Sequence, residues 1–126
     1  MLKDRALVQV ALPTMDLPRA VAFYRDLLGL PLLFEVSGMA FFQLHNGVRL
    51  MVGTNAPDLK PSESHAIYFD APDLPMLAEQ LVKRGITFRG PAQVLQKTAT
   101  GNLMLQFFRD PDGNLLGLMG VVPEKT

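Results

Sequence analysis

The chain of 126 residues repeats one pattern of predicted elements, and this repeat constrains its fold more than any other feature. In each half, a short apolar strand is followed by the tripeptide Asp-Leu-Pro, at residues 16–18 and again at 73–75. Asp favours the N-cap of a helix and Pro favours its first turn, so each tripeptide predicts a helix start. Gly29 and Gly85 then predict where the two helices end.

Strand-like runs surround these helices in both halves. In the first half they are 7–12, 32–36, 39–44 and 48–52, and in the second half they are 65–69, 86–89, 103–108 and 115–119. Asn46-Gly47 is a strong hairpin signal, and Asp112-Gly113 predicts the equivalent turn in the second half. The polar segment Gln96–Asn102 is predicted to be a loop.

The two predicted hairpins superpose at an offset of 66 residues. Phe41-Phe42 then falls on Phe107-Phe108, and Met51 falls on Gly117. Units this small do not each bury a hydrophobic face alone, so we expect the two copies to pair into one domain. We therefore predict a single domain over residues 1–126, with module one at about 5–54, a polar linker at 55–64 and module two at about 65–122.

Composition and charge exclude several classes of protein. The chain has no cysteine, which rules out disulfides and thiolate metal sites. Its 12 basic and 12 acidic residues balance, so nothing favours binding to nucleic acid or to an anionic membrane. No window approaches the roughly 20 apolar residues of a membrane span. We therefore expect a cytoplasmic protein without nucleic-acid or membrane partners.

Two stretches carry a resemblance to a known family. They are AFYRDLLGL at residues 22–30 and FRDPDGN at residues 108–114. With the repeat, they resemble the vicinal-oxygen-chelate superfamily, which includes glyoxalase I, extradiol dioxygenases and bleomycin-resistance proteins. The resemblance implies an α+β fold in which two βαβββ modules form a curved mixed sheet around a cup, with the helices outside. It also implies a homodimer.

The resemblance implies four metal-ligand positions, two on the first strands and two on the fourth strands of the modules. Here these positions hold Gln9, His65, Met51 and Gly117. Neither Met51 nor Gly117 can hold a divalent ion, and Gln9 with His65 leaves the ion without charge neutralisation. We therefore expect no metal. If a metal binds, Gln9 and His65 are the predicted ligands, with Glu35 as the leading third candidate.

Other side chains are predicted to contact a ligand in the cup. Gln9 and His65 either donate hydrogen bonds to it or are relics of a metal site. Arg49 shares a strand face with Met51, so it either anchors an acidic group or lies at the rim beside Glu35 or solvent. The remaining predicted contacts, which ordinary core packing explains equally well, are Phe42, Met51, Phe108 and Gly117. Tyr68 is left out of the site, because strand alternation separates it from His65.

Two functions follow from these residues. The first is a metal-free binding protein of the glyoxalase and bleomycin-resistance type that holds an apolar, anionic small molecule. The second is a lyase, isomerase or dioxygenase whose Zn, Ni, Mn or Fe ion acts on vicinal oxygens. The missing carboxylates at Met51 and Gly117 favour the first, and they leave open whether the protein is an enzyme.

Overall fold

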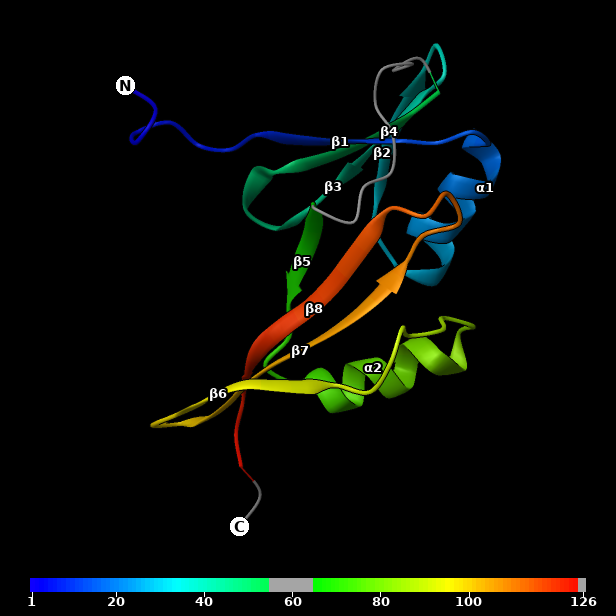
Figure 1. Cartoon of the computed structure of the whole chain (residues 1–126). Coiled ribbons are helices and arrows are strands. Elements are labelled where there is room, and N and C mark those ends of the chain that lie inside the picture. Colours follow the sequence, from blue (N-terminus) through cyan, green and yellow to red (C-terminus); the bar gives the residue numbers. More distant parts are fainter. Residues whose placement is uncertain (55–64, 125–126) are drawn as a thin grey trace. The chain divides into compact units, whose positions relative to one another are not determined.

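The chain divides into two compact units, Met1–Pro61 and Ser62–Thr126. A computed structural model describes residues 1–54 and 65–124 (Figure 1). Each unit has a four-stranded mixed sheet of its own and a helical segment, so the structure has the predicted α+β fold of two βαβββ modules. The predicted linker at 55–64 lies outside the described residues. No helix of the described part is long and apolar enough to cross a membrane.

The first unit contains one sheet with the strand order β1-β4-β3-β2, in which β1 runs parallel to β4 and the other pairs are antiparallel. Its elements are β1 (Gln9–Pro13), α1 (Leu17–Val21), the π-helix η1 (Ala22–Leu27), β2 (Leu32–Val36), β3 (Met39–Gln43), the short turn η2 (His45–Gly47) and β4 (Arg49–Gly53). Asn46 and Gly47 both have a positive φ, of 60° and 78°, as the Asn-Gly signal predicts for the turn between β3 and β4.

The helix of the first unit begins as predicted and then changes form. The carboxylate of Asp16 accepts a hydrogen bond of 3.1 Å from the backbone N–H of Arg19, so Asp16 is the N-cap. After Val21 the helix widens into η1, and the N–H of Leu28 donates to the carbonyl of Phe23 five residues back. The apolar periodicity does not predict this widening, because spacings of three and four residues are those of an ordinary α-helix.

One face of the first sheet packs against the helical segment. Its buried members are Ala40, Phe42, Leu50 and Val52. The Tyr24 ring lies 5.7 Å from the Phe42 ring, which joins η1 to β3. Strand alternation places the other residues on the opposite side. We call that side the helix-free face of unit 1, and its residues include Gln9, Ala11, Phe34, Met39, Phe41, Gln43, Arg49 and Met51.

The second unit has the equivalent strand order, β5-β8-β7-β6, with β5 parallel to β8. Its elements are β5 (Ala66–Asp70), α2 (Leu74–Lys83), β6 (Gln93–Thr98), β7 (Gly101–Arg109) and β8 (Leu115–Val122). Two predictions for this unit are wrong. The segment Gln96–Asn102 is not a loop but the tip of a β6–β7 hairpin, and Ile86–Arg89 forms only an isolated bridge between Phe88 and Phe108.

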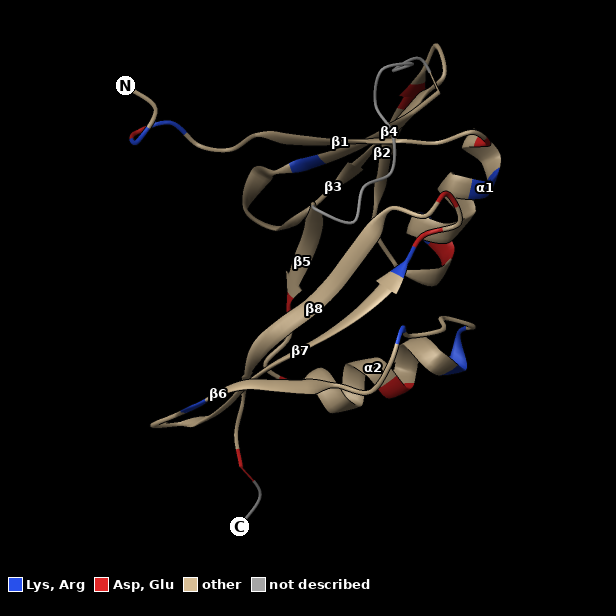
Figure 2. Ribbon diagram, in the orientation of Figure 1, with Lys and Arg blue, Asp and Glu red and all other residues tan. Residues whose placement is uncertain are grey.

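The second sheet also has one face against its helix. Phe108, Leu116 and Leu118 are buried there, as are Leu74 and Leu81 of α2. The opposite side is the helix-free face of unit 2, and its residues include Ala66, Tyr68, Asp70, Leu105, Phe107, Leu115, Gly117 and Met119. Charged residues lie mainly on the helices, on turns and near strand ends, while most of each sheet is uncharged (Figure 2).

A buried hydrogen-bond network fixes the turn between β7 and β8. The carboxylate of Asp110 accepts hydrogen bonds from the backbone N–H groups of Asp112 and Asn114, and from the Asn114 side-chain amide, over 2.7–2.9 Å. Asp110 and Asn114 are both buried, and Arg109 donates to the carbonyl of Gly113 at 2.8 Å. This motif therefore has the structural role that turn-forming Asp residues predict.

The pairing of the strands shows how far the repeat extends. Phe41 pairs with Met51 and Phe107 pairs with Gly117, which confirms the hairpin offset of 66. For the first strands, however, Gln9 pairs with Arg49 and Ala66 pairs with Leu115. The residue equivalent to Gln9 is therefore Ala66, and the predicted equivalence with His65 is wrong by one residue.

The close approach at Gly120 predicts a specific loss of stability. A Cβ at Gly120 would lie 2.4 Å from the backbone carbonyl of Ala71, whereas one at Gly90 meets nothing within 4 Å. We expect Gly120→Ala to lower the free energy of unfolding by about 1–3 kcal/mol, because the backbone of Ala71 must shift. Urea denaturation measures this, with Gly90→Ala as the matched control. Equal stability of the two variants would contradict the packing described here.

Candidate functional site

A row of polar side chains crosses the helix-free face of unit 1. Gln9 of β1 pairs with Arg49 of β4, and Arg49 pairs with Gln43 of β3. All three residues are half-buried. The side-chain amide of Gln43 donates to the carbonyls of Leu44 and Val48, at 2.9 and 3.2 Å, so it is held in place by its own hairpin. The row therefore presents one guanidinium between two amides.

The neighbouring row on this face is apolar. Ala11 pairs with Met51, and Met51 pairs with Phe41. The Phe41 ring stacks on the ring of Phe34, with centroids 4.6 Å apart and an angle of 24° between the planes. Phe34 is 44% exposed. Met51 is flexible and polarisable, so with these rings it forms an adaptable apolar surface beside the polar row.

Arg49 joins the two rows. Its guanidinium carbon lies 5.7 Å from the centre of the Phe41 ring, a cation–π contact. Within residues 1–54 and 65–124, the Arg49 side chain forms no ion pair, whereas Arg25 is paired with Asp26 and Lys83 with Glu79. None of the residues named above on the helix-free face of unit 1 is acidic. The face thus carries a positive charge without a counter-ion of its own among the described residues.

On the helix-free face of unit 2, Gly117 occupies the position that corresponds to Met51 of unit 1. Two rings lean over this glycine, that of Tyr68 from β5 and that of Phe107 from β7. Their centroids are 5.7 Å apart in an edge-to-face arrangement. The Arg89 guanidinium carbon lies 5.3 Å from the centre of the Phe107 ring. The resemblance places a metal ligand at Gly117, and the structure has aromatic rings around this residue instead.

Two predicted ligand contacts lie on the wrong side of their sheets for this role. Phe42 and Phe108 are 0% and 1% exposed and belong to the helix-packed faces. Phe42 pairs with Leu50, and Phe108 pairs with Leu116, so neither ring shares a face with Met51 or Gly117. The prediction that they line a ligand site is corrected here. Their neighbours Phe41 and Phe107 occupy the helix-free faces instead.

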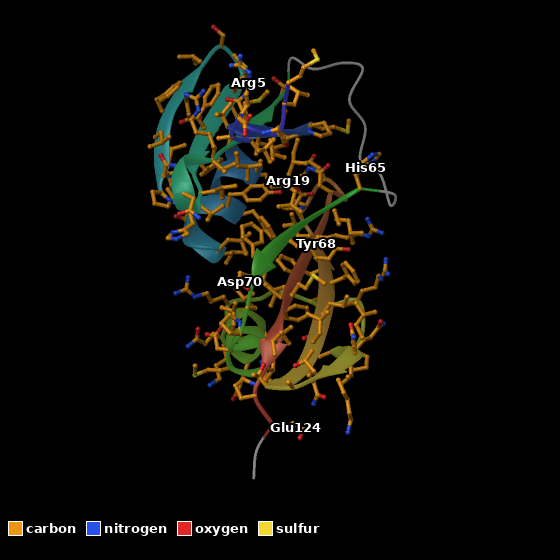
Figure 3. All side chains as sticks on the ribbon, turned by 90° about the vertical axis from the view of Figure 1, so that its left-hand side faces the viewer. Arg5, Arg19, His65, Tyr68, Asp70 and Glu124 are labelled. Atoms are coloured by element: carbon orange, nitrogen blue, oxygen red, sulfur yellow. The ribbon has the colours of Figure 1, made fainter. Side chains whose placement is uncertain are left out.

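His65 lies outside the strands of its own unit, and Glu35 does not lie on the helix-free face of unit 1. His65 is exposed and lies one residue before β5, while Tyr68 lies along that strand and Asp70 at its end (Figure 3). Glu35 pairs with Ala40, which faces the helix. Glu35 also contributes to the electrostatic field at Arg25 on η1. The structure thus brings together Gln9, Arg49 and Met51, but it does not bring Glu35 to the same face.

These positions test whether the chain fits the divalent metal that the resemblance implies for metal-dependent members. Residues 1–54 and 65–124 contain no group of three or more His, Asp or Glu side chains that could hold a metal ion. Gln9 is a neutral amide, Met51 offers only a thioether, and Gly117 offers no side chain. This donor set does not fit a divalent ion, which requires several oxygen or imidazole ligands.

On η1, Arg25 and Asp26 shift each other's pKa. A hydrogen bond and charge attraction from Asp26 raise the pKa of Arg25 above its ordinary value. The hydrogen bond from Arg25 in turn lowers the pKa of Asp26. Their side chains are half exposed, at 50% and 56%, so they form a surface ion pair. This pair lies on η1 and does not contribute an acid or base to the sheet faces.

Four aromatic side chains on these faces were not among the predicted contacts: Phe34, Phe41, Tyr68 and Phe107. A signal for two of them was present in the sequence. A hairpin closed at Asn46-Gly47 places Phe41 opposite Met51, and the 66-residue offset then places Phe107 opposite Gly117. Alternation counted from His65 leaves out Tyr68, but His65 lies outside β5, which begins at Ala66.

Comparison with known proteins agrees with this fold. The family model for the Glyoxalase/Bleomycin resistance protein/Dioxygenase superfamily matches residues 6–118. Since the match covers most of the 126 residues, the chain belongs to this superfamily. The comparison with curated proteins gave no match.

Solved structures with the same fold have varied descriptions. TnmS3, an antibiotic binding protein from a Streptomyces species, is 23% identical, with a TM-score of 0.74 and coverage of 96% of this chain and 99% of TnmS3. A lactoylglutathione lyase from Agrobacterium tumefaciens is 19% identical, with a TM-score of 0.71 and coverage of 94% and 95%. At these identities the likeness shows the fold alone, and the fold hosts both binding proteins and enzymes.

The donor set predicts the behaviour of the purified protein toward metals. We expect tag-free protein to contain far less than one Zn, Ni, Mn or Fe per chain, because Met51 and Gly117 supply no ligand. Elemental analysis measures this. Addition of each metal should leave the melting temperature unchanged, since a ligand raises it only by binding the native state.

The control for this prediction is His65→Ala, which removes the histidine that the resemblance places among the metal ligands. We expect it to behave as the wild type in both measurements. One metal per chain in the wild type that is lost in His65→Ala would show that the donor set has been assigned incorrectly.

Proposed function

We propose that this protein is a metal-free binding protein that holds an apolar small molecule with an acidic group on the helix-free face of unit 1. The observation that carries the proposal is Arg49, a half-buried guanidinium that contacts the Phe41 ring and has no carboxylate partner in the described residues. A planar guanidinium binds carboxylate and phosphate groups through two parallel hydrogen bonds.

The residues around Arg49 support a ligand with both polar and apolar parts. Gln9 and Gln43 flank the guanidinium in its row. The Gln9 amide can donate its N–H groups to a bound acidic group, whereas Gln43 already donates to the carbonyls of Leu44 and Val48. Met51, Phe41 and Phe34 offer the neighbouring apolar surface. Ligand sites combine such an apolar lining with a few placed polar groups.

The comparisons support binding without choosing the ligand. One similar structure is described as an antibiotic binding protein, and another as a lyase. A metal-dependent lyase, isomerase or dioxygenase is the alternative function, and the donor set at Gln9, Met51 and Gly117 argues against it. As the sequence predicts, we place the protein in the cytoplasm, without nucleic-acid partners.

We also propose that the protein is a homodimer joined through a sheet edge. β6 is the edge strand of the second sheet, and all six of its residues are exposed. Among them are two adjacent apolar side chains, Val94 and Leu95, at 53% and 60% exposure. An unpaired edge of this kind offers backbone hydrogen-bonding groups and apolar area to a second copy.

Replacing Arg49 tests the proposed ligand chemistry. We expect the wild type to bind naphthoate, an aromatic carboxylate, more tightly than the neutral compound naphthalene methanol. Arg49→Gln should weaken naphthoate binding about tenfold, the low end for hydrogen bonds to a charged group at a partly exposed site. The affinity for naphthalene methanol should stay within about twofold, because that compound has no charge for Arg49 to pair with. Isothermal titration calorimetry measures both constants.

Arg25→Gln is the matched control for this test. It removes the same charge from the same unit, but from an exposed ion pair on η1. We expect its naphthoate affinity to equal that of the wild type. If Arg49→Gln and Arg25→Gln bind naphthoate equally well, Arg49 is not an anchor and the proposed function fails.

A charge on the exposed edge tests the proposed dimer. We expect Leu95→Lys to shift the protein from dimer to monomer in analytical ultracentrifugation, because a lysine on an edge strand opposes edge-to-edge pairing. Val82→Lys on α2 is the control, since Val82 has a similar exposure of 56%. A wild type that sediments as a monomer, or a Leu95→Lys variant that remains a dimer, would refute pairing through β6.

A further inference from the structure

Two aromatic rings meet above the central strand pair of the second sheet. Tyr68 lies on β5 and Phe107 on β7, and β8 runs between these two strands. Strands on either side of a third are about 9–10 Å apart, too far for most side chains to touch. Here the ring centroids are 5.7 Å apart, because the residue between them on β8 is Gly117.

The space above Gly117 is filled by these rings. A Cβ at this position would lie 3.0 Å from Cδ1 of Tyr68, and 3.2 Å from Cδ1 and Cε1 of Phe107. The equivalent residue of the first unit is Met51, whose side chain occupies the corresponding place. Because Gly117 has no side chain, the two rings can contact each other above it. We call Tyr68, Phe107 and Gly117 the aromatic platform.

The platform remains open on the Tyr68 side. Tyr68 is 50% exposed, and its hydroxyl has no hydrogen bond to any described residue. Arg89 contacts Phe107 from the other edge of β7, since its backbone N–H donates to the Phe107 carbonyl at 2.8 Å. Phe107 is thus fixed between Arg89 and Tyr68, while the Tyr68 ring presents an accessible aromatic surface.

We propose that the aromatic platform stacks a planar aromatic ring of a small molecule bound on the helix-free face of unit 2. This inference goes beyond the proposed function, which concerns the helix-free face of unit 1, and it adds a second binding surface with its own class of ligand. Aromatic rings prefer offset-stacked or edge-to-face partners, and such pairs contribute beyond their buried area. A saturated ring of the same size gains burial on the platform but not this additional attraction.

The test compares two neutral probes, naphthalene methanol and its fully saturated analogue decahydronaphthalene methanol. We expect the wild type to prefer the aromatic probe by about two- to tenfold. Tyr68→Leu should abolish this preference, whereas Tyr68→Phe should retain it, because only the second variant keeps the ring. Titration calorimetry on the full chain gives the ratio, which a purely structural role of Tyr68 would not change.

A second readout locates the probe. Naphthalene methanol should move the NMR signals of the Gly117 amide and the Tyr68 ring protons through its ring current, and the saturated analogue should move them much less. Equal affinity of the wild type for the two neutral probes, or no binding of either, overturns the platform. Either result leaves the proposed function untouched, because the Arg49 test with charged naphthoate is a separate measurement. A third result also overturns the proposal: Tyr68→Leu changes the mass of the assembly but not the probe preference. It would mean that a second copy of the chain occupies the platform.

Discussion

The hydrogen-bonded turns fix strand register, and strand register determines which side chains each sheet presents. Successive residues of a strand point to opposite faces, so a slip of one residue would exchange the whole set. In the second unit, Asp110 holds the β7–β8 turn through three hydrogen bonds of 2.7–2.9 Å. That turn places Phe107 opposite Gly117 and directs Phe108 to the helix. The buried carboxylate of Asp110 therefore supports the register that directs Phe107 to the helix-free face, although Asp110 itself lies in the turn.

The same register gives the two units different chemistry. Both place a phenylalanine opposite the fourth-strand position of the resemblance, Phe41 beside Met51 and Phe107 beside Gly117. In the first unit, the methionine fills the centre of the face and Arg49 lies alongside it. In the second unit, the glycine leaves the centre to aromatic rings from both sides. The two units thus share their backbone pairing, while their helix-free faces differ: one carries charge and the other an aromatic surface.

The sequence predicts the fold well, because the fold depends on signals that are local. Asp16 caps its helix, Asn46 and Gly47 take the positive φ that their turn needs, and the hairpin offset is the one observed. The sites are less predictable, because the side of the sheet to which a side chain points depends on how distant strands pair. The sequence pattern places Phe42 and Phe108 on the ligand face, whereas the structure places their neighbours Phe41 and Phe107 on the helix-free faces. The predicted strand at 65–69 begins one residue before β5, so alternation counted from His65 leaves out Tyr68, which lies on the helix-free face of unit 2.

Arginine over phenylalanine recurs in both units, yet the two contacts are built differently. Arg49 reaches Phe41 from the adjacent strand β4, whereas Arg89 reaches Phe107 from a segment that precedes β6. A ring near a guanidinium attracts its positive charge without accepting hydrogen bonds from its N–H groups. A carboxylate partner would instead occupy those N–H groups. At Arg49, where no described carboxylate competes, the ring therefore attracts the charge without neutralising it.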